Sequence, residues 1–159
     1  MQNIGNEGPE LKNFDPLKLA EKSPEWVPFF REAELKHGRI AMLATAGWLA
    51  VDLGVTLPDH AGISSVAAHN AGVASGAMIQ ILFWTSLVEI ISCPAVAALK
   101  DGSRKPGDFS FDPLGFSKNA ASLAKYQINE LKNGRLAMMA FGGLATQSVL
   151  TGHGFPYLY

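Results

Sequence analysis

An eleven-residue motif that occurs twice is the feature of this chain that most constrains its fold. Residues 34–44 read Glu-Leu-Lys-His-Gly-Arg-Ile-Ala-Met-Leu-Ala, and residues 130–140 read Glu-Leu-Lys-Asn-Gly-Arg-Leu-Ala-Met-Met-Ala. A second motif, Phe-Asp-Pro-Leu, precedes each copy at residues 14–17 and 111–114. Two motifs that recur in the same order at nearly the same spacing indicate an internal duplication with an extra segment between the copies.

Three long apolar stretches lie at about residues 34–57, 71–99 and 130–150. A helix needs about 20 residues to cross the hydrocarbon core of a bilayer, and the first and third stretches reach that length only with their Glu and Arg ends included. Charged residues make up 17% of the chain and the mean hydropathy is +0.13. We expect an all-α membrane protein with three transmembrane helices, in which Pro58 ends the first helix and Pro94 bends or breaks the second.

The basic residues are sorted along the chain in the way that inserted membrane proteins require. All 13 lysines and arginines lie in residues 1–39, in residues 100–125, or at positions 132 and 135. With three spans, these regions fall on one side of the membrane, and residues 53–70 and 151–159 fall on the other. The net charge of −1 gives no reason to expect a nucleic-acid partner. The chain carries no His-Glu-x-x-His motif and no phosphate-binding glycine loop, so we do not expect an enzyme.

The duplication also sets the relative direction of the first and third helices. With three spans, both copies cross the membrane in the same direction, which predicts a pseudo-two-fold axis along the membrane normal. The two related helices are then expected to cross each other at that axis. Gly38 and Gly134 occupy equivalent places in the two copies, and the lack of a side chain there lets two backbones approach closely.

The Glu and Arg of each motif need partners, because unpaired charges inside a bilayer are costly. Glu34 and Arg39 lie about 140° apart around one helix, so they are poorly placed to pair with each other. The symmetric alternative joins each carboxylate to the arginine of the other copy: Glu34 to Arg135, and Glu130 to Arg39. Such pairs have either a structural role as an interhelical clamp, or a further role in which the second carboxylate oxygen binds a hard divalent ion such as Mg²⁺.

Each motif places a second polar group one turn after its glutamate. His37 follows Glu34 and Asn133 follows Glu130 by three residues, which is about 60° around the helix. Each copy therefore presents two neutral ligand groups toward lipid or a bound apolar molecule. Four groups separated by whole turns do not form one metal cage, so the pattern predicts four single axial ligands.

The Glu-x-x-His/Asn-x-Arg pattern, repeated after Phe-Asp-Pro-Leu, resembles the light-harvesting chlorophyll-binding antenna family. The resemblance covers nearly the whole chain, as a single three-helix domain of residues 1–159 with copies at about 14–57 and 111–150 and a middle helix at about 71–99. It implies that one chlorophyll magnesium is held by each of four side chains: Glu34, His37, Glu130 and Asn133. It also implies that Arg39 and Arg135 lock the first and third helices across each other.

Three further ligands follow from the same resemblance. Gln147 stands where the family places another ligand, about 25 Å along the helix from Glu130, so its pigment would lie in the opposite layer of the membrane. Gln80 and Glu89 in the middle helix are spaced as in the chlorophyll a/c members, which the short loops and tail also resemble. The alternatives are an interhelical hydrogen bond for Gln80 and a helix-end charge for Glu89.

The resemblance implies a light-harvesting subunit that binds chlorophyll a, chlorophyll c and xanthophyll carotenoids of the fucoxanthin or peridinin type. Its implied partners are the core of photosystem I or II, neighbouring antenna subunits and thylakoid lipids. The expected location is the plastid thylakoid membrane, with the N-terminus in the stroma and the C-terminus in the lumen. A photoprotective quencher of the same fold and a small membrane transporter are the alternatives. Three spans without a broken helix in either repeat argue against the transporter.

Overall fold

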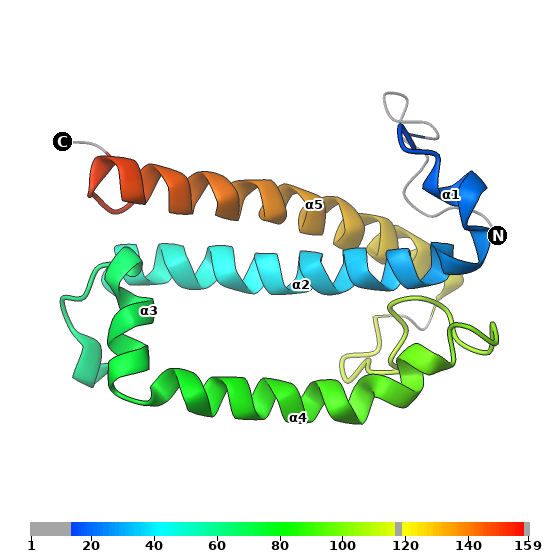
Figure 1. Cartoon of the computed structure of the whole chain (residues 1–159), viewed down its shortest axis with the longest axis horizontal. Helices are drawn as coiled ribbons and strands as arrows, with labels where there is room; N and C mark the ends of the chain where they lie inside the picture. Colours follow the sequence, from blue (N-terminus) through cyan, green and yellow to red (C-terminus); the bar gives the residue numbers. More distant parts are fainter. Residues whose placement is uncertain (1–13, 117–118, 158–159) are drawn as a thin grey trace. The chain divides into compact units, whose positions relative to one another are not determined.

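The computed structural model describes residues 14–116 and 119–157, and in this part of the chain every regular element is a helix and none is a strand. Figure 1 shows the five α-helices along the sequence. Their bounds are α1 Leu19–Lys22, α2 Val27–Asp52, α3 Ser65–Ala74, α4 Ala77–Ala97 and α5 Ala120–Thr151. Two short 3₁₀ helices, η1 (Pro24–Trp26) and η2 (Pro58–His60), precede α2 and α3. The all-helical expectation is therefore correct for the described residues.

The first long helix begins and ends earlier than the sequence suggests. The expected span of residues 34–57 ended at Pro58, whereas α2 covers Val27–Asp52. The helix stops because Gly54 adopts a left-handed conformation with φ +88°, and the amide of Val55 donates back to the carbonyl of Ala50 at 2.8 Å. A left-handed glycine followed by an amide that donates to a carbonyl of the last turn is a common helix end. It lies before Pro58 in the chain, so the proline is not what ends α2.

The middle stretch is two helices and not the single helix expected at residues 71–99. Ser64 caps α3, with its side chain accepting from the amide of Ala67, and α3 ends at Ala74. The chain then turns at Gly76, whose φ of +78° interrupts helical geometry, and α4 begins at Ala77. Pro94 lies inside α4, which continues to Ala97, so this proline does not end the helix.

The third long helix starts about three turns before its expected beginning at residue 130. α5 covers Ala120–Thr151, so its end agrees closely with the expected residue 150. Asn119 supplies the start, because its side-chain oxygen accepts from the amide of Ala121 at 3.2 Å and its carbonyl accepts from Leu123. An asparagine in this place is a favourable N-cap.

By length and composition, α4 is the one helix among the described residues that is apolar enough to cross a membrane. Its exposed apolar side chains surround the helix, from Ile79 at 66% exposure to Ile91 at 71%. α2 and α5 are longer, but each carries the charged residues of its motif.

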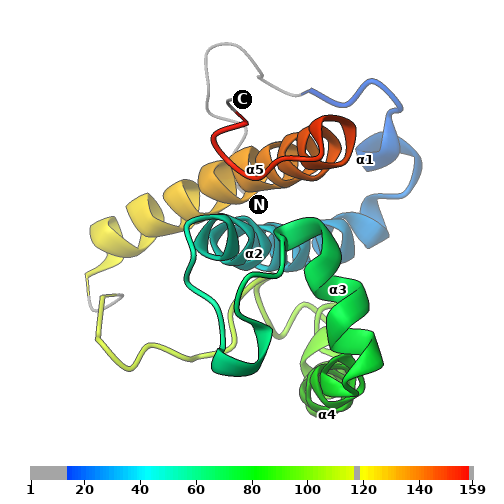
Figure 2. The ribbon, with the colours of Figure 1, turned by 90° about the vertical axis from the view of Figure 1, so that its left-hand side faces the viewer.

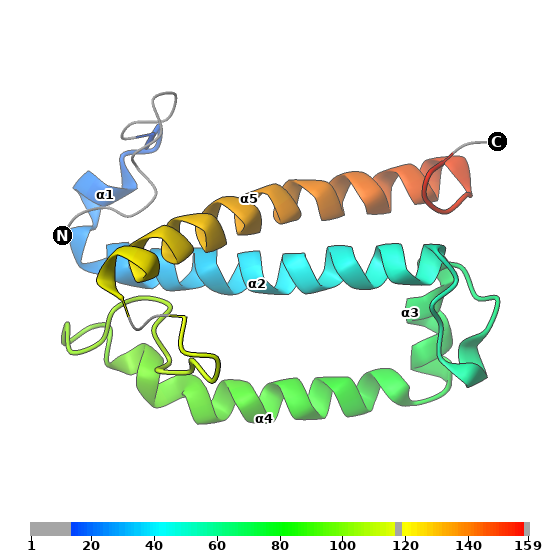
Figure 3. The same ribbon diagram turned by 180° about the vertical axis from the view of Figure 1, so that it is seen from behind.

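The chain divides into two compact units, and α2, α4 and α5 each contribute residues to both. The first unit consists of Met1–Arg39 and Pro94–Leu136. Within it, the beginning of α5 crosses over the first part of α2 (Figure 3). Leu99 and Leu131 are its buried apolar side chains, at 4% and 3% exposure, and Glu32 is also buried, at 2%.

The two Phe-Asp-Pro-Leu segments fold into the same turn within this unit. Asp15 and Asp112 each accept an amide four residues later, from Leu19 at 3.0 Å and from Phe116 at 3.1 Å. The residue three places after each aspartate is left-handed, with φ +54° at Lys18 and φ +69° at Gly115. The amides of Ala20 and Leu19 hold the pKa of the Asp15 carboxyl below its usual 3.8. The duplication is therefore visible in backbone conformation as well as in sequence.

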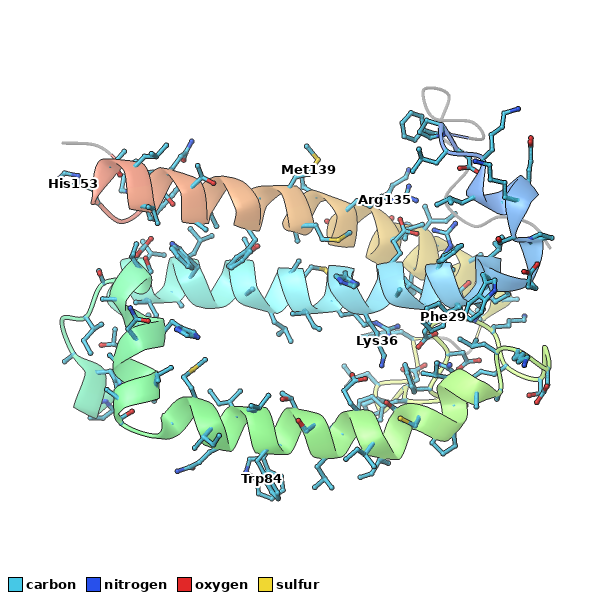
Figure 4. The ribbon with its side chains drawn as sticks, in the orientation of Figure 1. Phe29, Lys36, Trp84, Arg135, Met139 and His153 are labelled. Atoms are coloured by element: carbon cyan, nitrogen blue, oxygen red, sulfur yellow. The ribbon has the colours of Figure 1, made fainter. Side chains whose placement is uncertain are left out.

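The second unit consists of Ile40–Cys93 and Ala137–Tyr159. In it, α3 lies between the end of α2 and the start of α4 (Figure 2). Trp48 of α2 packs edge-on against Phe141 of α5, with ring centroids 5.7 Å apart. Figure 4 shows Trp84 and Met139 pointing outward from α4 and α5, in agreement with their exposures of 62% and 79%.

Candidate functional site

The two motif glycines meet where α2 and α5 approach each other within the first unit. A Cβ atom added to Gly38 would lie 3.0 Å from the Cα of Gly134, and the reverse substitution would give the same 3.0 Å. Both glycines are buried. Glycine at both positions permits this separation without displacement of either backbone, which is the close approach expected from the duplication.

Two ion pairs flank this crossing and join the motif of one helix to the motif of the other. The Nε of Arg39 donates to Oε1 of Glu130 at 2.7 Å, and the Nε of Arg135 donates to Oε1 of Glu34 at 2.7 Å. These are the partners expected from the sequence, and the two pairs have the same geometry. All four side chains keep between 27% and 39% of their surface exposed, so solvent, lipid or a bound molecule can reach the carboxylates.

His37 and Asn133 are held in equivalent ways by their own helices. Nδ1 of His37 lies 2.7 Å from the carbonyl oxygen of Ala33, and Nδ2 of Asn133 donates to the carbonyl of Asn129 at 2.9 Å. A carbonyl oxygen only accepts, so Nδ1 of His37 carries a proton, and in the neutral ring Nε2 then has a free lone pair. The same contact at Asn133 leaves its side-chain oxygen as the outward group. Both side chains are exposed, and each is fixed in the tautomer or orientation that a metal ligand needs.

The remaining candidate ligands lie in the second unit. Gln80 and Glu89 are on α4, Gln147 is on α5, and all three are exposed. Among the described residues, no three His, Cys, Asp or Glu side chains are grouped so that they could hold one metal ion. The structure therefore brings together the two ion pairs and the two glycines, and the other candidates are exposed side chains on α4 and α5.

A buried acidic side chain that the sequence patterns do not reveal fixes the segment after α4 to α2. Glu32 is 2% exposed, and it accepts from Nη2 of Arg104 at 3.2 Å and from the amide of Gly107 at 2.6 Å. Arg104 also donates to the carbonyls of Ala95 and Asp108. No local pattern marks this contact, because Arg104 and Gly107 lie in a connection whose path the sequence does not give.

Arg39 connects the same segment to the helix crossing. Its Nη2 donates to the carbonyl of Gly107 at 3.0 Å while its Nε binds Glu130. The ring of Phe109 lies 5.9 Å from the Arg39 guanidinium and 4.1 Å from that of Arg104. A side chain at Gly107 would collide with Leu35, and its φ of +79° also favours glycine. α2 therefore binds both the amide and the carbonyl of Gly107, through Glu32 and Arg39.

Two further contacts lie beside the candidate ligands. Arg31 donates to Oε2 of Glu34 at 2.5 Å, a three-residue helical spacing that could have been recognised in the sequence. Ser148, next to Gln147, is fully buried, accepts from Nε1 of Trp48 at 3.3 Å and donates to the hydroxyl of Tyr157. The Ser148 contacts fix the rotation of α5 in the second unit, with Gln147 on its outer surface.

Comparison with known proteins gives consistent matches over most of the chain. A family model described as chlorophyll A-B binding protein matches residues 3–149. A fucoxanthin-chlorophyll a-c binding protein of Chattonella marina var. antiqua is 36% identical, over 94% of this chain and 70% of its own length. A fucoxanthin-chlorophyll a-c binding protein F of Phaeodactylum tricornutum is 36% identical, over 89% and 76%. A photosystem I chlorophyll a/b-binding protein 5 of Arabidopsis thaliana is 32% identical, over 87% and 62%.

Proposed function

The chain belongs to the chlorophyll a-b binding protein family, and we propose that it is a light-harvesting antenna subunit that passes excitation energy to a photosystem core. One observation carries the proposal: the crossing of α2 and α5 in the first unit, where the two copies of the motif meet. There, two ion pairs neutralise the motif charges, and two polar groups are preset to face outward. We assign no reaction on a substrate to the chain, because the family that it belongs to is one of pigment-binding proteins.

Seven side chains are proposed to hold chlorophyll magnesium, one ligand each: Glu34, His37, Gln80, Glu89, Glu130, Asn133 and Gln147. Mg²⁺ is a hard ion that prefers oxygen ligands, and the carboxylates of the two ion pairs remain partly exposed. The free Nε2 of His37 and the outward oxygen of Asn133 fit the same role. When bound, the pigments supply light absorption and energy transfer, and the chain supplies their position and electrostatic surroundings.

We further propose that α2, α4 and α5 cross the thylakoid membrane, with α2 and α5 related by a pseudo-two-fold axis. All 159 residues then form one membrane domain, with repeat copies at about residues 14–57 and 111–150. Support comes from the apolar surface of α4, from the neutralisation of the motif charges on α2 and α5, and from exposed apolar residues such as Leu43 at 76%. Contiguous apolar surface of this kind marks contact with lipid, pigment or protein.

The proposed pigments are chlorophyll a, chlorophyll c and a xanthophyll of the fucoxanthin or peridinin type. The names of the relatives from Chattonella marina and Phaeodactylum tricornutum support this choice. The proposed partners are the core of photosystem I or II, neighbouring antenna subunits and thylakoid lipids. The sorting of basic residues supports an N-terminus in the stroma and a C-terminus in the lumen.

The test of the function is the pigment content and fluorescence excitation spectrum of the isolated protein. We expect bound chlorophyll and carotenoid, with carotenoid absorption exciting long-lived chlorophyll a emission. Pigment binding with a strongly shortened fluorescence lifetime would instead identify a photoprotective quencher. A purified membrane protein that binds no pigment would refute the antenna proposal and favour the transporter.

The ligand assignments are tested one at a time. His37→Phe, Asn133→Phe and Gln147→Leu should each lose about one chlorophyll while the fold persists, because each removes a single axial ligand to Mg²⁺. Lys132→Gln is the matched control, since it changes an exposed residue beside Asn133 and removes no proposed ligand. Full pigment stoichiometry in all three variants would show that these side chains have no ligand role.

The topology is tested by protease treatment of sealed membranes. Protease on the stromal face should cleave the N-terminal arm and residues 100–125, and it should spare residues 57–70. Cleavage of residues 57–70 from the stromal face would refute the three-span arrangement.

A further inference from the structure

The two duplicated carboxylates have unequal surroundings. Both oxygens of Glu34 accept from arginines: Oε1 from Nε of Arg135 at 2.7 Å, and Oε2 from Nη1 of Arg31 at 2.5 Å. Glu130 accepts from Nε of Arg39 at 2.7 Å through Oε1. Within the described residues, its Oε2 has no hydrogen-bond partner. Two guanidinium groups therefore share the carboxylate in the first copy, and one binds it in the second.

A single substitution between the copies accounts for this difference. The position three residues before each glutamate carries Arg31 in the first copy and Gln127 in the second. Both residues are half-buried at equivalent places on their helices. Gln127 carries no charge, so the second copy lacks the additional cation.

The other charged residues near the two sites do not cancel this asymmetry. Lys36 and Lys132 stand at equivalent positions, with Lys36 half-buried and Lys132 exposed, so neither is a cation that only the second copy carries. Glu32 has no acidic counterpart in the second copy, but its charge is balanced by Arg104. Lys125 lies five residues before Glu130, which is about 140° around α5.

We infer that Arg31 weakens Glu34 as a magnesium ligand relative to Glu130, so that the two duplicated carboxylate sites hold chlorophyll with different strengths. This inference rests on the proposed function of both glutamates as chlorophyll ligands. A guanidinium bound to a carboxylate oxygen draws electron density away from it and places positive charge beside the incoming Mg²⁺. At Glu130, by contrast, the second oxygen is available to the metal without that competition.

Arg31 has a second effect on Glu34, which acts in the opposite direction. A second arginine fixes the orientation of the Glu34 side chain, and a fixed ligand loses less conformational freedom when it binds a metal. If the fixed orientation of Glu34 mattered more than the positive charge of Arg31, removal of Arg31 would weaken chlorophyll binding. The direction of the change in Arg31→Gln therefore separates the two effects.

The experiment compares four pigment-loaded proteins: the natural chain, Arg31→Gln, Gln127→Arg, and the chain with both substitutions. Chlorophyll loss is followed during a graded detergent titration by pigment analysis, together with the red absorption band and far-ultraviolet circular dichroism. We expect Arg31→Gln to slow the earliest phase of chlorophyll loss about tenfold, since a charge-assisted hydrogen bond is worth at least that factor. Gln127→Arg should create a second early phase.

The double substitution should again show one early phase, now from the Glu130 site and with a different absorption change. Circular dichroism of the helices confirms that each variant is folded. Unchanged or faster chlorophyll loss in Arg31→Gln, with no effect of Gln127→Arg, would overturn this inference while the proposed function stands. A natural chain that binds no chlorophyll in the same experiment would overturn both.

Discussion

Replacement of Gly38 or Gly134 by alanine should weaken the fold, although alanine is the better helix former. The added Cβ would lie 3.0 Å from a Cα atom of the other helix, whereas carbon atoms in contact normally lie about 3.5–4.0 Å apart. The obstructing atom belongs to the backbone, so no side chain can rotate away. The two helices must therefore separate by a few tenths of an ångström at the crossing to relieve this contact.

The size of the effect follows from three contributions. Overpacking of this kind costs about 1–3 kcal/mol, and the higher helix propensity of alanine offsets about 1 kcal/mol of that cost. Separation of the helices also stretches the flanking ion pairs, which are 2.7 Å long, and hydrogen bonds to charged groups contribute about 1.5–3 kcal/mol each. Their partial loss should leave a net destabilisation of about 1–3 kcal/mol.

Thermal unfolding of the pigment-loaded protein, followed by visible circular dichroism, measures this destabilisation. For a chain of this size, 1 kcal/mol shifts Tm by about 2–4 °C, so each variant should unfold several degrees early. Gly47→Ala on α2 and Gly142→Ala on α5 are the controls, because nothing lies within 4 Å of the Cβ added at either position. If Gly38→Ala and Gly134→Ala unfold no earlier than these controls, the close crossing does not limit stability.

Three other perturbations have defined outcomes. Arg39→Leu and Arg135→Leu should each lower the unfolding free energy by about 1.5–3 kcal/mol, because each removes a hydrogen bond to a carboxylate; unchanged thermal stability of both would contradict this. Glu32→Ala leaves the charge of Arg104 without its acidic partner and should cost about 3–5 kcal/mol. It should also speed trypsin cleavage after Arg104, and an unchanged cleavage rate would show that Glu32 does not hold this segment. The lowered pKa of Asp15 means that its stabilisation of α1 is present above pH 3.8 and is lost as the pH falls through the lower folded-state pKa. Asp15→Asn should abolish that acid-dependent loosening in amide hydrogen exchange at the start of α1, and an unchanged pH profile would exclude this carboxylate as its source.

The crossing of α2 and α5 could be predicted from the sequence because the same charged residues and glycine occur in both copies of the motif. A Glu and an Arg five residues apart are poorly placed to pair on one helix. With two equivalent copies, the symmetric alternative is for each Glu to pair with the Arg of the other copy. The structure contains both exchanged pairs, with the two glycines between them. The side-chain orientations of His37 and Asn133 could not be predicted from the sequence, because they depend on hydrogen bonds to carbonyls one turn earlier in each helix.

The helix ends and the buried contacts could not be predicted from the sequence patterns for physical reasons. The left-handed conformations of Gly54 and Gly76 set the end of α2 and the break before α4. A hydropathy pattern carries no information about whether a glycine has positive φ. The middle stretch reads as one continuous apolar segment although Gly76 divides it. Glu32 resembles any solvated acid next to Arg31, and only the path of the segment around Arg104 and Gly107 buries it.

The two equivalent turns before α1 and α5 differ in one residue that matters for their backbone. The aspartate, the proline and the hydrogen bond across four residues are retained in both, while the left-handed position is Lys18 in one copy and Gly115 in the other. A left-handed lysine costs about 1–2 kcal/mol that glycine does not. The two turns therefore share one backbone conformation although the residue at the left-handed position differs, and only the first copy carries the strain of a left-handed side chain.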